Sequence, residues 1–281
     1  MVMSGKVKKR IGTFLFYLFV IAFVALLLLP FIWQFLTSVK PLKEIAEMPA
    51  RWIPSRIQFD FYVNVFTKHP FARYMLNSFV VAICATLLSI AIGASAAYAL
   101  SRLRFRGRKA LLMVILSISM FPTIATLSPL YLILRGMGLL NTYAGLVLPY
   151  IVFSLPFAIW LMSSFFSQLD HGYEEAAYLD GCTHFQTFVK IMLPLIRPAT
   201  FSVGLLVFIN CWNEYLYALT FMSKEEMRTV PVGIALFPSN YQLHWGDMAA
   251  ASIVCTVPLI ILVLIFQKNI VAGLTTGGVK G

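Results

Sequence analysis

The sequence predicts an all-α protein whose helices cross a membrane six times. Of its 281 residues, 60% are hydrophobic and only 12% are charged, whereas soluble domains carry about 45–50% apolar and about 25% charged residues. The mean hydropathy is +0.83. Six apolar runs reach the roughly 20 residues that a helix needs to cross a bilayer. Together these figures exclude a soluble domain, a disordered chain and a disulfide-rich secreted scaffold.

The six runs share an apolar composition with few charges. They cover residues 13–36, 74–100, 110–134, 143–166, 199–222 and 247–267. We therefore expect one transmembrane domain over residues 1–281. The first run follows four cations, as a signal sequence does, but it exceeds the roughly 7–15 apolar residues of a cleavable signal. It is expected to remain as the first span.

The distribution of basic residues sets the expected orientation. The short loop between the second and third runs holds five cations: Arg102, Arg104, Arg106, Arg108 and Lys109. Such loops stay in the cytoplasm, and the same side receives the larger share of the 22 Lys and Arg residues. Both termini, including the tail 268–281, are therefore expected in the cytoplasm. Because the net charge of +11 lies in loops between apolar runs, it indicates membrane topology rather than nucleic-acid binding.

Prolines and small residues interrupt the runs. Pro122 and Pro129 lie in the third run, where each removes a backbone hydrogen bond and should break or kink the helix. Lipid tolerates this only where neighbouring helices cover the freed carbonyl. In the second run, Gly93 and Ala97 let helix backbones approach closely. We expect a packed, kinked bundle, and packing alone is enough to explain any one of these residues.

The connection between the fourth and fifth runs, residues 167–198, predicts two short helices on the cytoplasmic side. Asp170 is placed to cap the first helix, and Gly181 is placed to end it. Thr183 and Gln186 have the spacing of a capping box for the second helix, which Pro194 should stop. A helix, a glycine turn and a second helix projecting from a bundle are suited to docking a partner.

This connection also carries a resemblance to a known family. Glu175-Ala176-Ala177, Gly181, Ile191 and Leu193-Pro194 stand at the spacing of the EAA signature. That signature marks the permease subunits of binding-protein-dependent ABC importers, which the chain resembles. Asp180 before the glycine also fits. The alternative is an ordinary amphipathic loop, which gives no reason for so many fixed positions.

The resemblance extends along most of the chain, which is similar to the carbohydrate branch of that family. It rests on Asn77-Ser78, residues 98–102, residues 138–142, Trp212-Asn213-Glu214 and the tail 273–281. These segments resemble the shorter, six-span permease of maltose-type sugar importers. The resemblance implies the type I ABC importer permease fold, in the cytoplasmic membrane of a bacterium or archaeon.

The same resemblance implies the partners and the energy source. It implies a heterodimer with a second permease, two cytoplasmic ATPase subunits that bind ATP and Mg²⁺, an extracytoplasmic solute-binding protein, and a carbohydrate substrate. The contacts with the ATPase would then fall on Glu175, Ala176, Ala177, Asp180, Gly181, Ile191, Leu193 and Pro194. The sequence itself holds no phosphate loop, nucleophile–base pair or metal-ligand spacing. We therefore expect no catalytic site, metal site or cofactor in this chain.

Three polar residues stand in the fifth run: Asn210, Asn213 and Glu214. An ionised carboxylate deep in a membrane costs on the order of 2.5–3.5 kcal/mol or more, so Glu214 should face the bundle interior or a cavity. These side chains either line the path of a hydroxyl-rich solute or form a helix–helix hydrogen bond that fixes a gate. The sequence leaves both open.

Two other functions fit a six-span chain. An ion-coupled secondary transporter needs ionisable residues deep in several spans, and Glu214 alone meets that condition. A non-transporting membrane scaffold is compatible with the composition but leaves the EAA spacing unexplained. The external loop 40–73 mixes aromatic and basic residues, which fits either the membrane interface or the solute-binding protein.

Overall fold

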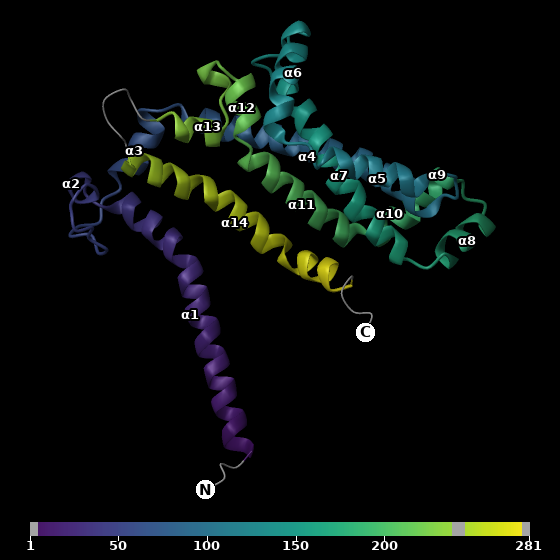
Figure 1. Cartoon of the computed structure of the whole chain (residues 1–281), viewed down its shortest axis with the longest axis horizontal. Helices are drawn as coiled ribbons and strands as arrows, with labels where there is room; N and C mark the ends of the chain where they lie inside the picture. The colour runs from purple at the N-terminus through teal and green to yellow at the C-terminus, as the bar shows by residue number, and fades with distance from the viewer. Residues whose placement is uncertain (1–4, 238–244, 277–281) are drawn as a thin grey trace. The chain divides into compact units, whose positions relative to one another are not determined.

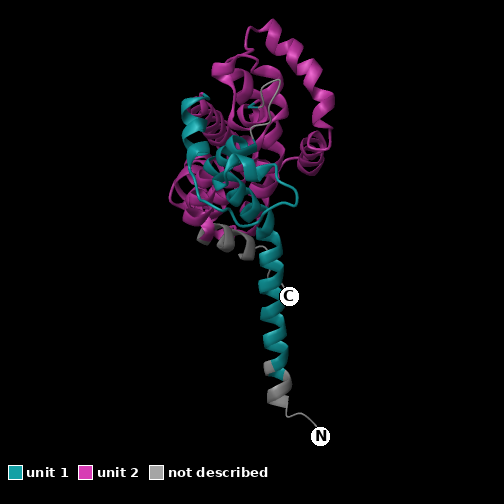
Figure 2. Ribbon diagram, turned by 90° about the vertical axis from the view of Figure 1, so that its left-hand side faces the viewer, with its two compact units in different colours: residues 1–69, 237–254 teal, residues 70–236, 255–281 magenta. Residues whose placement is uncertain are grey.

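The computed structural model describes residues 5–237 and 245–276, and within these residues every regular element is a helix. The chain forms two compact units (Figure 2). The first comprises residues 1–69 and 237–254, and the second comprises residues 70–236 and 255–281. The units are described separately.

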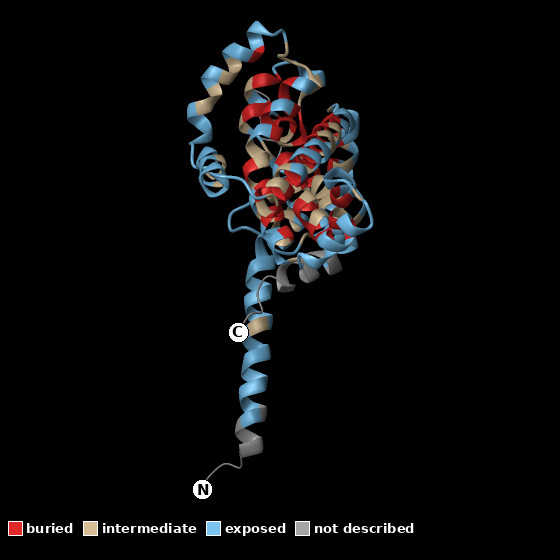
Figure 3. Cartoon of the chain, turned by 90° about the vertical axis from the view of Figure 1, so that its right-hand side faces the viewer, coloured by how far each residue is buried: buried red, intermediate tan, exposed pale blue. Residues whose placement is uncertain are grey.

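The first unit contains α1 (Gly5–Val39), α2 (Leu42–Ile45), α3 (Asp60–Thr67) and the start of α14 (Trp245–Thr276). The most apolar window of Ile11–Val39 has none of its residues buried by the chain itself, as the exposed colour along α1 shows (Figure 3). Such a surface requires lipid or another protein around it. On α3, Phe61 and Val65 are buried.

A charged pair follows α1 in the first unit. The Lys40 ammonium lies 4.1 Å from the centre of the Trp33 ring and donates to the Arg51 carbonyl. The Glu44 carboxylate accepts hydrogen bonds from the Ser55 backbone and hydroxyl. Burial lowers the pKa of Lys40, and the Ser55 hydroxyl holds the pKa of Glu44 below its ordinary value. Two charged groups are thus fixed in the loop that was expected to be an external one.

In the second unit, α4 (Phe71–Arg102), α7 (Tyr143–Gln168) and α11 (Arg197–Asn213) pack side by side (Figure 1). A Cβ added at Gly93 would lie 3.2 Å from the Ala158 Cβ, a tight contact that the absence of a side chain at Gly93 avoids. Ala97 and Ala158 are fully buried. The small residues of the second run therefore permit close helix packing, as predicted.

The third apolar run is broken as its proline predicts. It forms α5 (Arg108–Ile118) and α6 (Thr123–Gly136), whose axes differ by 87°. Pro122 stands at the N-cap of α6 with extended backbone (φ −59°, ψ 124°). Pro129 lies inside α6 without ending it, so of the two prolines only Pro122 stands at a break between helices.

The expectation of one helix over 199–222 is wrong. The helix α11 ends at Asn213, and α12 (Leu216–Phe221) begins after an extended Glu214 (φ −67°, ψ 130°). The helical segment that adjoins α11 comes before it in the sequence. His184–Leu195 and Arg197–Asn213 form a pair of helical segments bent by 79°. The physical reason for the break at Glu214 is the hydrogen bonding of its carboxylate, described below.

Four described helices are long and apolar enough to cross a membrane, or up to six if each bent pair is one span. The four are Ile11–Val39, Phe71–Arg102, Tyr143–Gln168 and Trp245–Gln267, which contain the expected runs 13–36, 74–100, 143–166 and 247–267. The expected tail 268–281 begins inside α14, and its residues 277–281 lie outside the described residues.

The start of α4 is tied to a distant segment of the second unit. The Asn77 amide donates to the carbonyls of Glu226 and Arg228, at 2.8 and 2.9 Å. The Ser78 hydroxyl accepts from the backbone N–H of Val230 at 2.8 Å. Both side chains are buried. This pair fixes η2 (Glu225–Met227) and α13 (Val230–Ala235) against α4.

Candidate functional site

The connection 167–198 forms a helical hairpin, which we define as residues 170–195. Its first arm is α8 (Gly172–Leu179), and its second arm is α9 (His184–Thr187), η1 (Phe188–Met192) and α10 (Leu193–Leu195). Gly181 turns the chain with φ +81°. The N–H groups of Gly181 and Cys182 donate to the carbonyls of Tyr178 and Ala177, at 3.0 and 2.9 Å. This is a Schellman end, so the prediction that Gly181 ends the first helix is confirmed.

The predicted cap at Asp170 is wrong by one position. His171 is the N-cap of α8, and it has no side-chain capping bond. The Asp170 carboxylate accepts instead from the Gly172 N–H at 2.8 Å. Because the backbone of His171 is already close to helical (φ −65°, ψ −24°), Asp170 still satisfies one N–H of the first turn, from one position before the N-cap.

The second arm begins as predicted and ends later. The Gln186 N–H donates to the Thr183 hydroxyl at 3.3 Å, and the Thr183 N–H donates to the Gln186 side chain at 2.9 Å, so the capping box is confirmed. Pro194 does not stop the helix, which continues to Leu195. The turn before it is widened, with the Leu193 N–H donating to the Phe188 carbonyl. A wider turn accommodates a proline ring that an α-helical turn would push into the preceding carbonyl.

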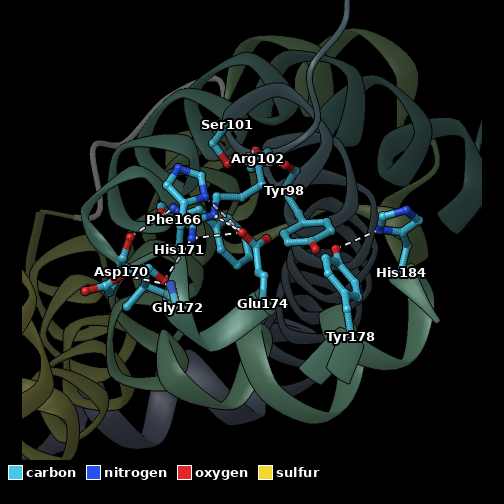
Figure 4. A network of polar contacts seen from close by, with 12 residues as sticks. Tyr98, Ser101, Arg102, Phe166, Asp170, His171, Gly172, Glu174, Tyr178 and His184 are labelled. Carbon is cyan, nitrogen blue, oxygen red and sulfur yellow. Dashed lines mark hydrogen bonds and ion pairs between the residues drawn. The ribbon is translucent and has the colours of Figure 1, made fainter. Parts of the chain in front are cut away.

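A buried polar network joins the hairpin to two long helices (Figure 4). The Arg102 guanidinium, at the end of α4, lies 2.9 Å from the Glu174 carboxylate on α8. It also donates to the carbonyls of Leu169 and Asp170, at 2.9 and 3.0 Å, and more weakly to that of Phe166 at 3.4 Å. The Arg102 and Glu174 side chains are 1% and 8% exposed. One guanidinium therefore holds the end of α4, the end of α7 and the first turn of α8 together.

Aromatic rings pack beside this network. The Tyr98 ring lies 5.6 Å from that of Phe166 and 5.1 Å from that of Phe188, which belongs to the second arm. The Tyr98 hydroxyl faces Glu174 and Tyr178 (Figure 4). Met192 is fully buried. Both arms of the hairpin are thus packed against α4 and α7.

Glu174 is a buried residue of the hairpin that the sequence did not single out. It stands directly before the matched motif and three positions before Ala177, which is also buried. This spacing places both residues on the inner face of α8. The signal that could have found it is the pairing of a buried acidic position with the cationic loop that begins at Arg102.

The eight residues expected to meet an ATPase divide into three groups by exposure. Glu175, Ala176, Asp180, Gly181 and Pro194 are exposed, Ile191 and Leu193 are half-buried, and Ala177 is buried. Ala177 therefore packs inward. Two apolar side chains that the motif does not include, Leu179 and Phe185, are 89% and 73% exposed at the end of the hairpin.

A second site is a cavity of about 420 Å³ in the second unit. It lies where both helix breaks occur, since its lining includes Ser119 and Phe121 from the first break and Glu214 from the second. Asn210 also lines it. Asn213 does not line it, because its amide donates to the Ile209 carbonyl at 3.0 Å. The structure therefore brings together two of the three polar residues of the fifth run.

Glu214 makes the break that separates α11 from α12. Its carboxylate accepts from the N–H groups of Tyr217 and Ala218, at 2.9 and 3.1 Å, and from the Tyr150 hydroxyl at 2.6 Å. A carboxylate at the start of a helix satisfies N–H groups that have no partner within the helix. Glu214 therefore both accepts a helix–helix hydrogen bond and forms part of a cavity wall.

Comparison with known proteins identifies the family. Residues 89–276 match the family described as the inner membrane component of binding-protein-dependent transport systems. The chain is 42% identical over 256 residues to the trehalose transport system permease protein SugB of Mycobacterium tuberculosis, covering 90% of this chain and 93% of SugB. It is 40% identical over 283 residues to the trehalose/maltose transport system permease protein MalG of Thermococcus litoralis, covering 99% and 100%.

Other comparisons agree. The sulfoquinovosyl glycerol transport system permease protein SmoH of Agrobacterium fabrum is 41% identical over 254 residues, covering 90% of this chain and 89% of SmoH. A crystal structure of a bacterial ABC transporter that imports alginate contains a chain with a TM-score of 0.79 and 24% identity, covering 95% of this chain and 99% of that one. That likeness shows an ABC importer permease fold. The chain therefore belongs to the inner membrane components of binding-protein-dependent transport systems, a family of multi-pass permeases.

Proposed function

We propose that this chain is the permease subunit of an ATP-driven carbohydrate importer and forms half of its translocation path. The names of SugB, MalG and SmoH support the carbohydrate class. In this proposal the chain pairs with a second permease, receives solute from an extracytoplasmic binding protein, and takes its energy from two ATPase subunits that hold ATP and Mg²⁺. Both termini lie in the cytoplasm.

The cavity has the chemistry that a carbohydrate requires. Its walls include the rings of Phe153, Phe157 and Tyr217, which offer flat apolar faces to the C–H faces of a sugar. Asn210 and Glu214 offer a donor and acceptors to hydroxyl groups. A volume of about 420 Å³ lies within the range of small-molecule sites. We assign this cavity to the solute path.

The buried Arg102–Glu174 pair is the observation that carries the coupling role. The exposed end of the hairpin, with Leu179 and Phe185, is an apolar surface to which an ATPase subunit would bind. Movement of the ATPase would displace the hairpin as a rigid body. Because Arg102 joins α8 to the ends of α4 and α7, the displacement would reach α7, which borders the cavity.

Site-directed cross-linking tests this proposal on the assembled complex. Leu179→Cys, in a background with Cys182→Ser, should cross-link to the ATPase, because Leu179 is 89% exposed. Ala177→Cys is the matched control and should react far less, since Ala177 is 2% exposed. Sugar uptake into vesicles should also require ATP inside them. Failure of Leu179→Cys to cross-link under any nucleotide, or uptake driven by an ion gradient without ATP, would refute the proposal.

A further inference from the structure

We propose that the second unit holds an anionic phospholipid at the junction of α4, α5 and α7. Arg104, Arg106 and Arg108 would bind its phosphate, and a groove beside them would hold one acyl chain. The proposal goes beyond the transport role, since the ligand is a resident lipid rather than a solute. It rests on two adjoining cavities with different chemistry.

The first cavity is polar and cationic. It has a volume of about 710 Å³, and its lining includes Arg104, Arg106, Arg108, Ser101 and Ser167. Gly107, with φ +88°, turns the chain so that the loop returns into α5 and its arginines border one space. Guanidinium groups and serine hydroxyls are the donors that bind a phosphate group.

The charge of these three arginines is not used within the described chain. Arg102 also borders the cavity, but its guanidinium is engaged by Glu174 and by backbone carbonyls. In residues 5–237 and 245–276, no carboxylate lies within ion-pair distance of Arg104, Arg106 or Arg108. Three neighbouring cations without a counter-charge attract an anion.

The second cavity is a partly apolar groove of about 300 Å³. It shares Ser101, Arg108 and Ser167 with the first cavity, so the two adjoin. Its other lining residues are the apolar Leu100, Leu112 and Trp160, together with Ser163, Ser164 and Lys109. Trp160 lies seven residues before Ser167 on α7, which places it about 10 Å further along the helix from the cationic end.

This arrangement fits a lipid better than free phosphate. A free phosphate would occupy the cationic cavity and leave the groove empty, whereas a phospholipid has a charged head and a chain that match both. The groove begins beside the basic loop, at one end of the spans. In the orientation expected from the sequence, this end lies at the cytoplasmic surface of the membrane, where anionic headgroups gather. Basic pockets between spanning helices are suited to such headgroups.

Lipid retention by the purified complex tests the proposal. The complex is incubated with vesicles of phosphatidylcholine and phosphatidylglycerol and repurified, and its bound lipid is measured by mass spectrometry. Substituting Arg104, Arg106 and Arg108 with Gln should lower the retained phosphatidylglycerol about tenfold. The matched control substitutes the exposed Lys43, Arg56 and Lys68 of the first unit with Gln, which removes the same charge and should leave retention unchanged.

A third variant separates lipid from phosphate. Ser164→Trp fills the groove without changing charge, because Ser164 is exposed and lines it. It should also lose phosphatidylglycerol. Equal losses in the two triple variants would overturn the proposal in favour of bulk charge. Full retention by Ser164→Trp, with displacement of the lipid by inorganic phosphate, would overturn it in favour of a phosphate site. Neither result depends on sugar uptake, so the proposed function is tested separately.

Discussion

Arg102 and Glu174 stand 72 positions apart in the sequence, and their side chains meet at 2.9 Å in a buried ion pair. Neither side chain has appreciable access to water, so each charge depends on the other for compensation. Arg102 also binds carbonyls at the end of α7. The hairpin therefore has a polar attachment to α4 and α7 in addition to the packing of Tyr98, Phe166 and Phe188.

Glu174→Gln should destabilise the complex and reduce transport. Removing one partner of a buried ion pair costs about 3–5 kcal/mol, because the other charge stays buried without compensation. The measurement is the thermal unfolding of the purified complex together with ATP-driven uptake in vesicles. Glu175→Gln is the matched control, since Glu175 is exposed, and it should change the stability of this chain by about 0.5 kcal/mol or less. Equal shifts of the unfolding temperature in the two variants would contradict the role given to the pair.

Glu214→Ala should impair transport more than Tyr150→Phe. The alanine leaves the N–H groups of Tyr217 and Ala218 without their acceptor and removes a charge from the cavity wall, whereas the phenylalanine removes one hydrogen bond. Hydrogen bonds to charged groups contribute about 1.5–3 kcal/mol each, so uptake should fall by at least about tenfold. The rate and half-saturation of sugar uptake check this. An alanine variant with normal uptake would exclude Glu214 from the solute path.

Gly181→Ala should lower stability through the backbone. At φ +81°, a Cβ costs about 1–2 kcal/mol, although nothing lies within 4 Å of the position that it would occupy. Gly136→Ala is a suitable control, because Gly136 has equally open surroundings and ends the helix α6 without a positive φ. The unfolding temperatures of both variants distinguish strain from crowding. A Gly181→Ala complex as stable as Gly136→Ala would show that the turn relaxes at no cost.

Ser55→Ala should lower the stability of the first unit near neutral pH and make that stability less dependent on pH in the acid range. The Ser55 hydroxyl holds the pKa of Glu44 below its ordinary value, so the folded state favours the charged carboxylate. That stabilisation is present above the ordinary carboxyl pKa of about 4.3 and is lost as the pH falls through the lower, folded value. In Ser55→Ala the folded pKa of Glu44 lies closer to its ordinary value, so less stability is lost as the pH falls. Unfolding temperatures measured between about pH 3 and about pH 6 test this.

A substitution at an exposed carboxylate serves as the control. Glu47 pairs with Arg51 at 3.4 Å, and both side chains are about half exposed. Glu47→Gln should leave the acid limb of the unfolding curve in place, because an exposed pair contributes little. If Ser55→Ala and Glu47→Gln shift that limb equally, the hydrogen bond from Ser55 is not the cause.

The local features of this chain could be predicted from sequence, whereas the features that need distant partners could not. The capping box at Thr183, the turn at Gly181 and the break at Pro122 follow from the chemistry of a few neighbouring residues. The break at Glu214 depends on Tyr150, from another helix, as well as on local N–H groups. The apolar run of the fifth segment gave no sign of it, because hydropathy does not record where a carboxylate finds its donors.

The Arg102–Glu174 contact shows the same limit. Arg102 begins a basic loop, and Glu174 lies in the first turn of a helix. In both kinds of segment a charged side chain is usually solvated. Only the packing of α4 against α7 brings them together and excludes water. The widened turn before Pro194 could not be predicted either, because the sequence shows the proline but not how the helix accommodates it.

Two helix breaks border one cavity. This arrangement bears on how the solute preference of a permease can change. The walls of the cavity meet at two joints, near Ser119 and at Glu214, and its dimensions depend on the angles at those joints as well as on side-chain size. A substitution at one of these helix breaks can change the shape of the cavity while the long helices keep their packing. Under the proposed function, a change of solute can therefore begin at these few positions without loss of stability in the bundle.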